Sequence, residues 1–190
     1  MHQLPVDRPN PWKTTSTRQV YDNPWIEVSH REVITPTGTD GIYGHVRFKN
    51  LAVGVIPIDD HDHTWLVGQY RYAIDRYTWE IPEGGCPIGT NPADTARREL
   101  IEECGLDCGN VELLAECDLS NSVTDEMAFI YTATDLSPTA TDPDDTEEIE
   151  IMRLPIDEAI AHVLDGSITD ALSMIGLLRL HSARLTATSG

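Results

Sequence analysis

Lysine and aromatic side chains are scarce in this chain of 190 residues. Lys13 and Lys49 are its two lysines, aromatic residues make up 6%, and the formal net charge is −19 at pH 7. Nucleic-acid backbones and anionic membranes both attract clustered Lys and Arg. We therefore expect no nucleic acid and no membrane among its partners.

Long apolar runs and paired cysteines are also missing. No segment is apolar for long enough to span a membrane, and the N-terminus does not resemble a signal peptide. None of the four cysteines is spaced as in a Cys-x-x-Cys zinc site. These absences predict a reduced, cytoplasmic protein, and its length favours one domain that buries roughly 70% of its unfolded surface.

A helix bounded by clear signals is predicted from about Pro92 to Cys104. Asn91 can cap its start, Pro92 suits the first helical position, and Gly105 suits the left-handed end. Apolar positions recur at helical spacing, and Cys104 lies among them as a small buried hydrophobe.

Three carboxylates share one face of this helix. Glu99, Glu102 and Glu103 lie at positions i, i+3 and i+4, where like charges repel by roughly 0.2–0.5 kcal/mol per pair. Oxygen ligands grouped this way suit Mg²⁺, with Mn²⁺ as a second possibility. The competing interpretation is a solvated acidic face, which is the usual meaning of such a charge run. The surrounding loop favours the metal.

The segment from residue 84 to residue 106 resembles the Nudix box, the signature of hydrolases that act on nucleoside diphosphates linked to another moiety. Eight fixed positions of the box are in register: Gly84, Arg98, Glu99, Leu100, Glu102, Glu103, Gly105 and Leu106. One position departs, because Thr90 stands where the family has a Glu that braces the box by pairing with the Arg.

The resemblance implies roles for the box residues. Glu99 and Glu103 match the usual metal ligands, Glu102 is a further ligand or a partner close to them, and the backbone carbonyl of Glu83 adds a ligand. Arg98 and Glu102 are thereby candidate catalytic residues. Because Thr90 cannot pair with Arg98, we expect Arg98 to find another acceptor, either Glu102 or a loop carbonyl.

Segments outside the box resemble ADP-ribose pyrophosphatases and related nucleotide-sugar hydrolases. Arg71 is a candidate phosphate clamp, and Glu80 a candidate contact to the distal sugar or nucleoside. Trp79 either stacks on a base or belongs to the core. Glu126 resembles a glutamate of a substrate loop, with local pairing in a turn as its alternative.

An acidic loop near residues 144–150 resembles the mobile loop that supplies a late carboxylate in this branch. Glu147 aligns best as the late metal ligand or catalytic base, and Asp145 and Glu148 remain candidates. The competing interpretation is an ordinary acidic loop.

The implied fold is α/β: a Nudix α/β/α sandwich with a mixed sheet, preceded by an N-terminal antiparallel β region. We divide the chain into a loose arm (1–10), the β region (11–50), the hydrolase domain (51–182) and a frayed tail (183–190). The resemblance implies that the β region forms a homodimer and reaches a neighbouring active site. By their composition, residues 136–145 are expected to form a flexible loop.

A second acidic group contains His61, His63 and the aspartates at 59, 60 and 62. It raises a metal hypothesis, but a turn between two strands is the interpretation we favour, because the chain reverses there.

The leading functional hypothesis is an Mg²⁺-dependent pyrophosphohydrolase that cleaves ADP-ribose or a similar nucleoside diphosphate sugar into a nucleoside monophosphate and a sugar phosphate. One alternative, kept open by Thr90, cleaves the glycosidic bond and releases a nucleoside diphosphate. Another is a non-catalytic module that binds ADP-ribose.

Overall fold

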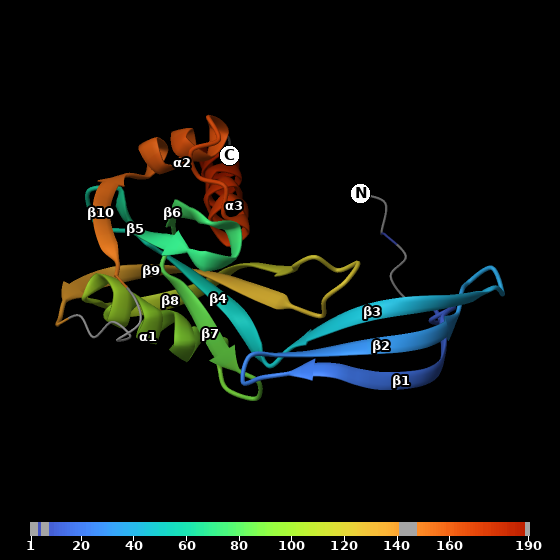
Figure 1. The fold of residues 1–190 in the computed structure, drawn as a ribbon. Coiled ribbons are helices and arrows are strands. Elements are labelled where there is room, and N and C mark those ends of the chain that lie inside the picture. Colours follow the sequence, from blue (N-terminus) through green and yellow to red (C-terminus); the bar gives the residue numbers. More distant parts are fainter. Residues whose placement is uncertain (1–3, 5–7, 141–147, 189–190) are drawn as a thin grey trace. The chain divides into compact units, whose positions relative to one another are not determined.

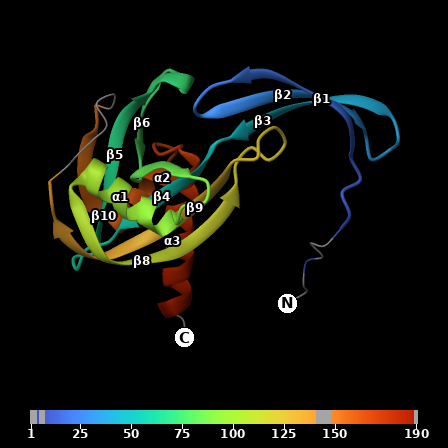
Figure 2. The same cartoon turned by 90° about the horizontal axis from the view of Figure 1, so that it is seen from below.

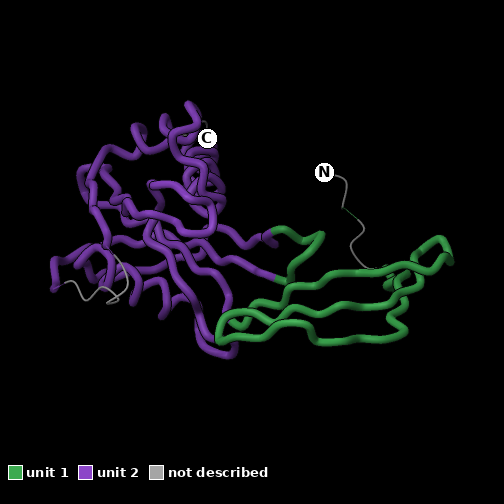
Figure 3. Tube along the Cα trace, in the orientation of Figure 1, with its two compact units in different colours: residues 1–49, 120–125 green, residues 50–119, 126–190 purple. Residues whose placement is uncertain are grey.

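The computed structural model describes Leu4, residues 8–140 and residues 148–188 (Figure 1). The chain divides into two compact units, which Figure 3 distinguishes by colour. Unit 1 comprises residues 1–49 and 120–125, and unit 2 comprises residues 50–119 and 126–190.

Unit 1 is an antiparallel sheet of three strands, β1 (Lys13–Asp22), β2 (Ile26–Ile34) and β3 (Asp40–Phe48), which lie side by side (Figure 1, Figure 2). Gly38, with φ of 85°, closes the turn between β2 and β3. Residues 120–125 join this unit, since Val46 bridges Thr124 and the Tyr43 hydroxyl donates to the Ser122 carbonyl at 2.5 Å.

Unit 2 contains two sheets. The first has the order β7 (Glu83–Pro87), β4 (Asn50–Pro57), β9 (Met127–Pro138) and β8 (Leu106–Asp118). It is mixed, because β4 and β9 run parallel while the other pairs are antiparallel. The second sheet is antiparallel and has the order β10 (Glu150–Pro155), β5 (His63–Arg71) and β6 (Arg76–Glu80). A short 3₁₀ turn, Tyr72–Ile74, links β5 to β6.

Helices cover both faces of the mixed sheet. Val53 and Val55 of β4 pack with Leu100 of helix α1 (Pro92–Cys104), whereas Ile56 packs with Leu177 of α3 (Ala171–Thr188). Helix α2 (Ile156–Leu164) contributes its apolar face to the α3 side. A strand with both faces covered reads as a continuous apolar run, which is what the sequence around Val53 shows. The α/β/α sandwich with a mixed sheet is confirmed.

Close approach of α3 to the sheet requires a small residue. A Cβ added at Gly176 would lie 2.9 Å from Ile130 and 3.0 Å from Ile56, so a larger residue would push the helix outward. Neither α3 nor any other helix in the described part of the chain has the length and apolar character needed to cross a membrane.

Some segments are more ordered than expected. Strand β9 continues to Pro138, inside the segment expected to be a loop from Leu136, because β8 starts early and pairs Leu106 with Pro138. Helix α3 continues to Thr188, into the expected frayed tail. Arg184 holds it there by donating to Asp62 at 2.6 and 2.9 Å. The ends of β9 and α3 are therefore set by strand pairing and an ion pair with residues far away in the sequence.

The Asp- and His-rich segment between β4 and β5 is a turn, as favoured. Oδ1 of Asp59 accepts the N–H groups of His61 at 2.8 Å and His63 at 3.0 Å. Oδ2 of Asp59 accepts Nε of Arg153 at 2.9 Å. The first two bonds close the turn, and the bond to Arg153 ties it to β10. Burial acts to raise the pKa of Asp59, but the two N–H groups and the guanidinium outweigh it and lower the pKa to about 2.

Replacing Asp59 tests this clasp. Since the folded pKa lies below the usual 3.8, the carboxylate stabilises the fold above that value and loses its effect as pH falls towards 2. Asp59→Ala is expected to lower the free energy of unfolding by about 1–3 kcal/mol at pH 7. The difference from the wild type should shrink between pH 4 and pH 2. Urea titrations at several pH values measure it, with the exposed neighbour Asp60→Ala as control. An equal loss in both variants would contradict the clasp.

Candidate active site

Helix α1 is fixed at both ends and presents two of its carboxylates to the interior. Oδ1 of Asn91 accepts the N–H of Ala93 at 3.2 Å, and Gly105, with φ of 63°, closes the other end. Glu99 and Glu103 are 7% and 3% exposed, so they face the protein interior. The helix limits and its apolar Cys104 face are as predicted.

Gly84 forms a cradle for Glu99. A Cβ added at Gly84 would lie 2.0 Å from Oε1 of Glu99, so the carboxylate occupies the space that any other residue would fill. The box glycine is required here for close approach to its own glutamate.

Because Thr90 replaces the family's Glu, Arg98 was expected to find other hydrogen-bond acceptors, and it does. Its guanidinium pairs with Glu102 one turn on, donates to the Gly85 carbonyl at 3.1 Å, and reaches Oε1 of Glu99 at 2.5 Å. Thr90 closes its own loop instead, since its hydroxyl donates to the Pro87 carbonyl at 2.7 Å. The predicted bracing by Glu102 and a loop carbonyl is confirmed.

The turn between β6 and β7 lies against α1. The N–H of Glu83 donates to Oε2 of Glu103 at 2.9 Å. The Pro82 carbonyl accepts the N–H of Val55 on β4 at 2.9 Å, and the N–H of Ile81 donates to Oγ of Ser173 on α3 at 2.9 Å. Three elements thus fix three consecutive residues.

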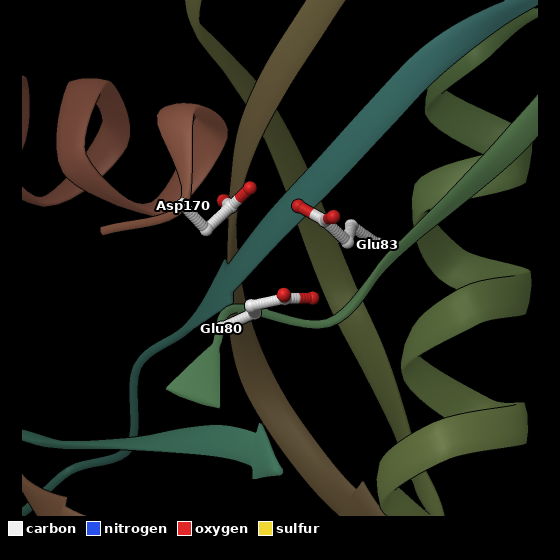
Figure 4. A group of neighbouring side chains, drawn as sticks. All are labelled: Glu80, Glu83 and Asp170. Carbon is white, nitrogen blue, oxygen red and sulfur yellow. The ribbon is translucent and has the colours of Figure 1, made fainter. Parts of the chain in front are cut away.

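A second acidic group lies beside this turn. Glu80, Glu83 and Asp170 bring carboxylate oxygens within 4.8 Å of one another, and their side chains point together (Figure 4). Arg71 bridges two of them, with Nε to Glu80 at 2.9 and 3.0 Å and Nη2 to Glu83 at 2.8 Å. Glu80 also accepts the Thr78 hydroxyl at 2.6 Å.

Glu83 is the unusual member of this group. Its Oε2 is buried and has no hydrogen-bond partner in the described part of the protein. Burial, followed by the neighbouring Asp170 and Glu80 carboxylates, holds the pKa of Glu83 well above its usual range, and Arg71 opposes them only in part.

Other predicted site residues take varied positions. Trp79 is half-buried, packs on the core and meets Tyr77 edge-on at 6.0 Å between ring centroids, which fits its core alternative. Glu126 is half-buried just before β9, where its carbonyl accepts the N–H of Leu119 at 2.9 Å. Glu148 is exposed beside β10 and, after burial and Glu150, contributes to raising the pKa of Tyr77. Asp145 and Glu147 lie outside the described residues.

The box residues fit a divalent cation. Two buried carboxylates one helical turn apart, Glu99 and Glu103, supply hard oxygen donors, and the missing Cβ of Gly84 leaves the space that the Glu99 carboxylate occupies. Glu102, with a side chain 31% exposed, lies on the open side of the helix. Such a donor set suits Mg²⁺ or Mn²⁺ rather than a soft metal.

Two residues of this region carried no predicted role, Asp170 and Ser173. Oδ2 of Asp170 accepts both the N–H and the hydroxyl of Ser173 at 2.8 Å. An Asp just before a run of helical apolar spacing is an N-cap signal, so the sequence offered the cap. It offered nothing about the contact to Ile81, because 92 positions separate the two residues.

Comparison with protein families gives two matches along the chain. The NUDIX domain profile matches residues 48–172. The profile of the nucleoside diphosphate sugar hydrolase N-terminal domain matches residues 12–46.

Similar proteins include a methanol dehydrogenase activator of Bacillus methanolicus, 31% identical over 87% of this chain and 90% of its own. An ADP-ribose pyrophosphatase of Mycobacterium tuberculosis is 34% identical over 69% of this chain and 65% of its own. The ADP-ribose pyrophosphatase of Bacillus subtilis is 27% identical over 84% and 86%. A crystal structure of an ADP compounds hydrolase superposes with a TM-score of 0.82 at 21% identity, covering 93% of this chain and 96% of that one. It supports the fold.

Removing the charge of Glu83 is expected to stabilise the metal-free protein as pH rises. A carboxyl whose folded pKa exceeds its usual 4.5 favours folding below that pH and loses this advantage as it ionises in the folded state. The stability of Glu83→Gln relative to wild type should therefore increase from pH 4.5 upward. Urea titrations in EDTA measure it, with the exposed Glu116→Gln as control. A difference that falls with pH would show that Arg71 dominates instead.

Proposed function

Because the chain belongs to the Nudix family of hydrolases, we propose that it is a divalent-cation-dependent pyrophosphohydrolase of nucleoside diphosphate sugars. ADP-ribose is the first candidate substrate, and the products are a nucleoside monophosphate and a sugar phosphate. The observation that carries this proposal is the pair Glu99 and Glu103, buried together on the box helix beside the Gly84 cradle. The N-terminal profile and the ADP-ribose pyrophosphatases among the relatives favour this substrate class.

In this proposal Glu99, Glu103 and Glu102, with the Glu83 carbonyl, hold Mg²⁺ or Mn²⁺. The bound cation neutralises diphosphate charge and lowers the pKa of a coordinated water. The chain's own part is to hold the ligands in place. Arg98 fixes the Glu99 and Glu102 carboxylates, and the Glu83 N–H fixes Glu103.

Arg71 and Glu80 form the substrate side of the proposed site. The Arg71 side chain is 35% exposed and is held by Glu80, whose side chain is 3% exposed. A guanidinium fixed in this way offers its remaining edge to a phosphate. Glu80 then acts mainly through Arg71, and Trp79 mainly supports the strand that carries Glu80.

The proton acceptor is proposed to come from the acidic segment before β10. Glu147 is the first candidate for this late ligand or base, and Asp145 and Glu148 are the alternatives. Glu126 remains the proposed contact from the substrate loop.

A product assay tests the activity. We expect the purified protein with Mg²⁺ or Mn²⁺ to convert ADP-ribose into AMP and ribose 5-phosphate, identified by mass spectrometry alongside other nucleoside diphosphate sugars. Release of a nucleoside diphosphate and a free sugar from a substrate whose sugar is linked through its anomeric carbon would instead show glycosidic cleavage. If the protein binds nucleotide sugars tightly but hydrolyses none of them with any of several divalent metal ions, it is a non-catalytic binding module.

The variant Glu103→Gln tests the assignment of Glu103 as a metal ligand. Because it keeps shape and removes a charged ligand, it is expected to lower turnover at least about a hundredfold while the protein stays folded. Glu116→Gln, exposed on β8, should retain wild-type turnover. Near wild-type activity of Glu103→Gln at saturating Mg²⁺ would refute the role of Glu103.

We also propose that the N-terminal β region, residues 11–50, makes the protein a homodimer. Every residue of β1 is exposed, and this unit leaves large apolar side chains open to solvent, such as Ile42 at 69% and Trp25 at 66%. Apolar exposure of this kind marks interaction surfaces. The four free cysteines fit a reducing compartment, and we propose the cytoplasm.

Multi-angle light scattering tests the dimer. The wild type is expected at twice the chain mass of 21.1 kDa. Ile42→Asp places a charge in the proposed apolar interface and should shift the mass towards the monomer. Ile151→Asp, an exposed apolar position on β10, is the control. A monomeric wild type contradicts this assembly, and a dimer that survives Ile42→Asp contradicts a role of Ile42 in it.

A further inference from the structure

The turn that carries the proposed carbonyl ligand is held by a buried serine from the other end of the chain. Ser173 of α3 is fully buried, and its Oγ accepts the N–H of Ile81 at 2.9 Å. Ile81 stands before Pro82, which has no N–H to give. The Ile81 N–H is therefore the donor through which the start of this turn is anchored to α3.

Asp170 orients the serine hydroxyl. Its Oδ2 accepts the hydroxyl and the N–H of Ser173, both at 2.8 Å. A hydroxyl has one hydrogen to donate and lone pairs to accept. Because the hydroxyl hydrogen is donated to Asp170, the Ser173 oxygen presents a lone pair to the Ile81 N–H. The hydrogen bonds therefore run in one direction, from Ile81 to Ser173 to Asp170.

Packing fixes the same residue from its side-chain end. Ile81 is fully buried, and a Cβ added at Gly54 of β4 would lie 2.8 Å from its Cδ1. The Ile81 backbone and side chain are both immobilised. Two residues on, the Glu83 N–H bonds to Glu103 of the box helix. A shift at Ile81 is therefore transmitted to the Glu83 carbonyl and the Glu103 carboxylate.

We propose that Asp170 and Ser173 form a positioning pair that sets the Ile81–Glu83 turn, and with it the divalent-cation site of the box helix. This inference rests on the proposed function for its catalytic consequence. Neither residue touches the reacting atoms in this account, because both act through the backbone of the turn. The alternative is that Asp170 only caps α3. Capping needs the Ser173 N–H and not its hydroxyl, so the hydroxyl separates the two roles.

The test compares Mn²⁺ affinity, measured by electron paramagnetic resonance of the free ion, with turnover in full-length variants. Ser173→Ala keeps the capped N–H and deletes the acceptor. It is expected to weaken Mn²⁺ binding and to lower kcat/KM, each roughly 10- to 100-fold, as for residues that orient metal ligands. Ser173→Thr restores the hydroxyl and should recover most of the affinity.

Thr64→Val is the matched control, because it also deletes a fully buried hydroxyl. Its Oγ1 has no hydrogen-bond partner in the described part of the structure, and it lies on β5 opposite Leu154 of β10. It should bind Mn²⁺ and turn over as the wild type does. If Ser173→Ala does not fold, Ser173→Cys fills the same space with a poor acceptor and should show the same loss.

Unchanged Mn²⁺ affinity in Ser173→Ala overturns the positioning role, as does an equal loss in Thr64→Val. A Ser173→Thr variant as weak as Ser173→Ala also overturns it. If the wild type binds Mn²⁺ but hydrolyses no nucleotide, the proposed function fails, and the affinities still decide the positioning role. A wild type that binds no Mn²⁺ overturns both.

Discussion

The site depends on one constraint, the fixed backbone of the Ile81–Glu83 turn. Its N–H groups and carbonyl bond to Ser173 on α3, to Val55 on β4 and to Glu103 on α1. Helices α1 and α3 cover opposite faces of the mixed sheet. The turn therefore connects the two helical layers that the sheet separates. Buried backbone groups must find partners, and one of the partners here, Glu103, is also a residue of the proposed metal site.

The same turn explains how so many carboxylates lie close together. Glu80 precedes it, Glu83 is its last residue, and Asp170 meets both from the start of α3. Arg71 supplies one positive charge, and the N-terminus of α3 favours negative charge by roughly 0.3–1 kcal/mol. Burial and the neighbouring Asp170 and Glu80 carboxylates outweigh these favourable charges, so the pKa of Glu83 remains raised. The Glu83 side chain points towards Asp170, whereas its N–H faces Glu103, so one residue belongs to both acidic groups.

Local signals in the sequence predicted local structure well. Helix α1 begins and ends where Asn91, Pro92 and Gly105 indicate, because capping depends on residues within one turn. The continuous apolar run around Val53 is likewise typical of a strand covered on both faces. The resemblance to the box singled out Glu99 and Glu103, and the structure buries both side chains. The substitute acceptors of Arg98 followed from one departing position, Thr90.

Long-range contacts could not be read in this way. The end of β9 is set by Leu106 on β8, and the end of α3 by Asp62 in a distant turn. Ser173 looked like an ordinary helix residue, because its partner Ile81 lies far away in sequence. The sequence suggested Arg71 as a phosphate clamp but did not predict that Glu80 and Glu83 form ion pairs with its guanidinium. Residues that act through a neighbour become visible only when the fold brings that neighbour to them.

The box of this chain is braced by Glu102 and by backbone carbonyls, where its family uses the Glu at the position of Thr90. Arg98 donates to the Gly85 carbonyl, and the Thr90 hydroxyl donates to the Pro87 carbonyl. The two positions that pair with each other in the family therefore each bond to the backbone of the same loop here. A carbonyl in a strand cannot rotate away as a Glu side chain can, and fixing it costs no additional side-chain entropy. Arg98 thereby stays over Glu99, whose carboxylate is pressed against Gly84. The Glu99 carboxylate is held in place although the residue that defines the family's brace is absent, because a fixed guanidinium holds it whichever acceptors fix that guanidinium.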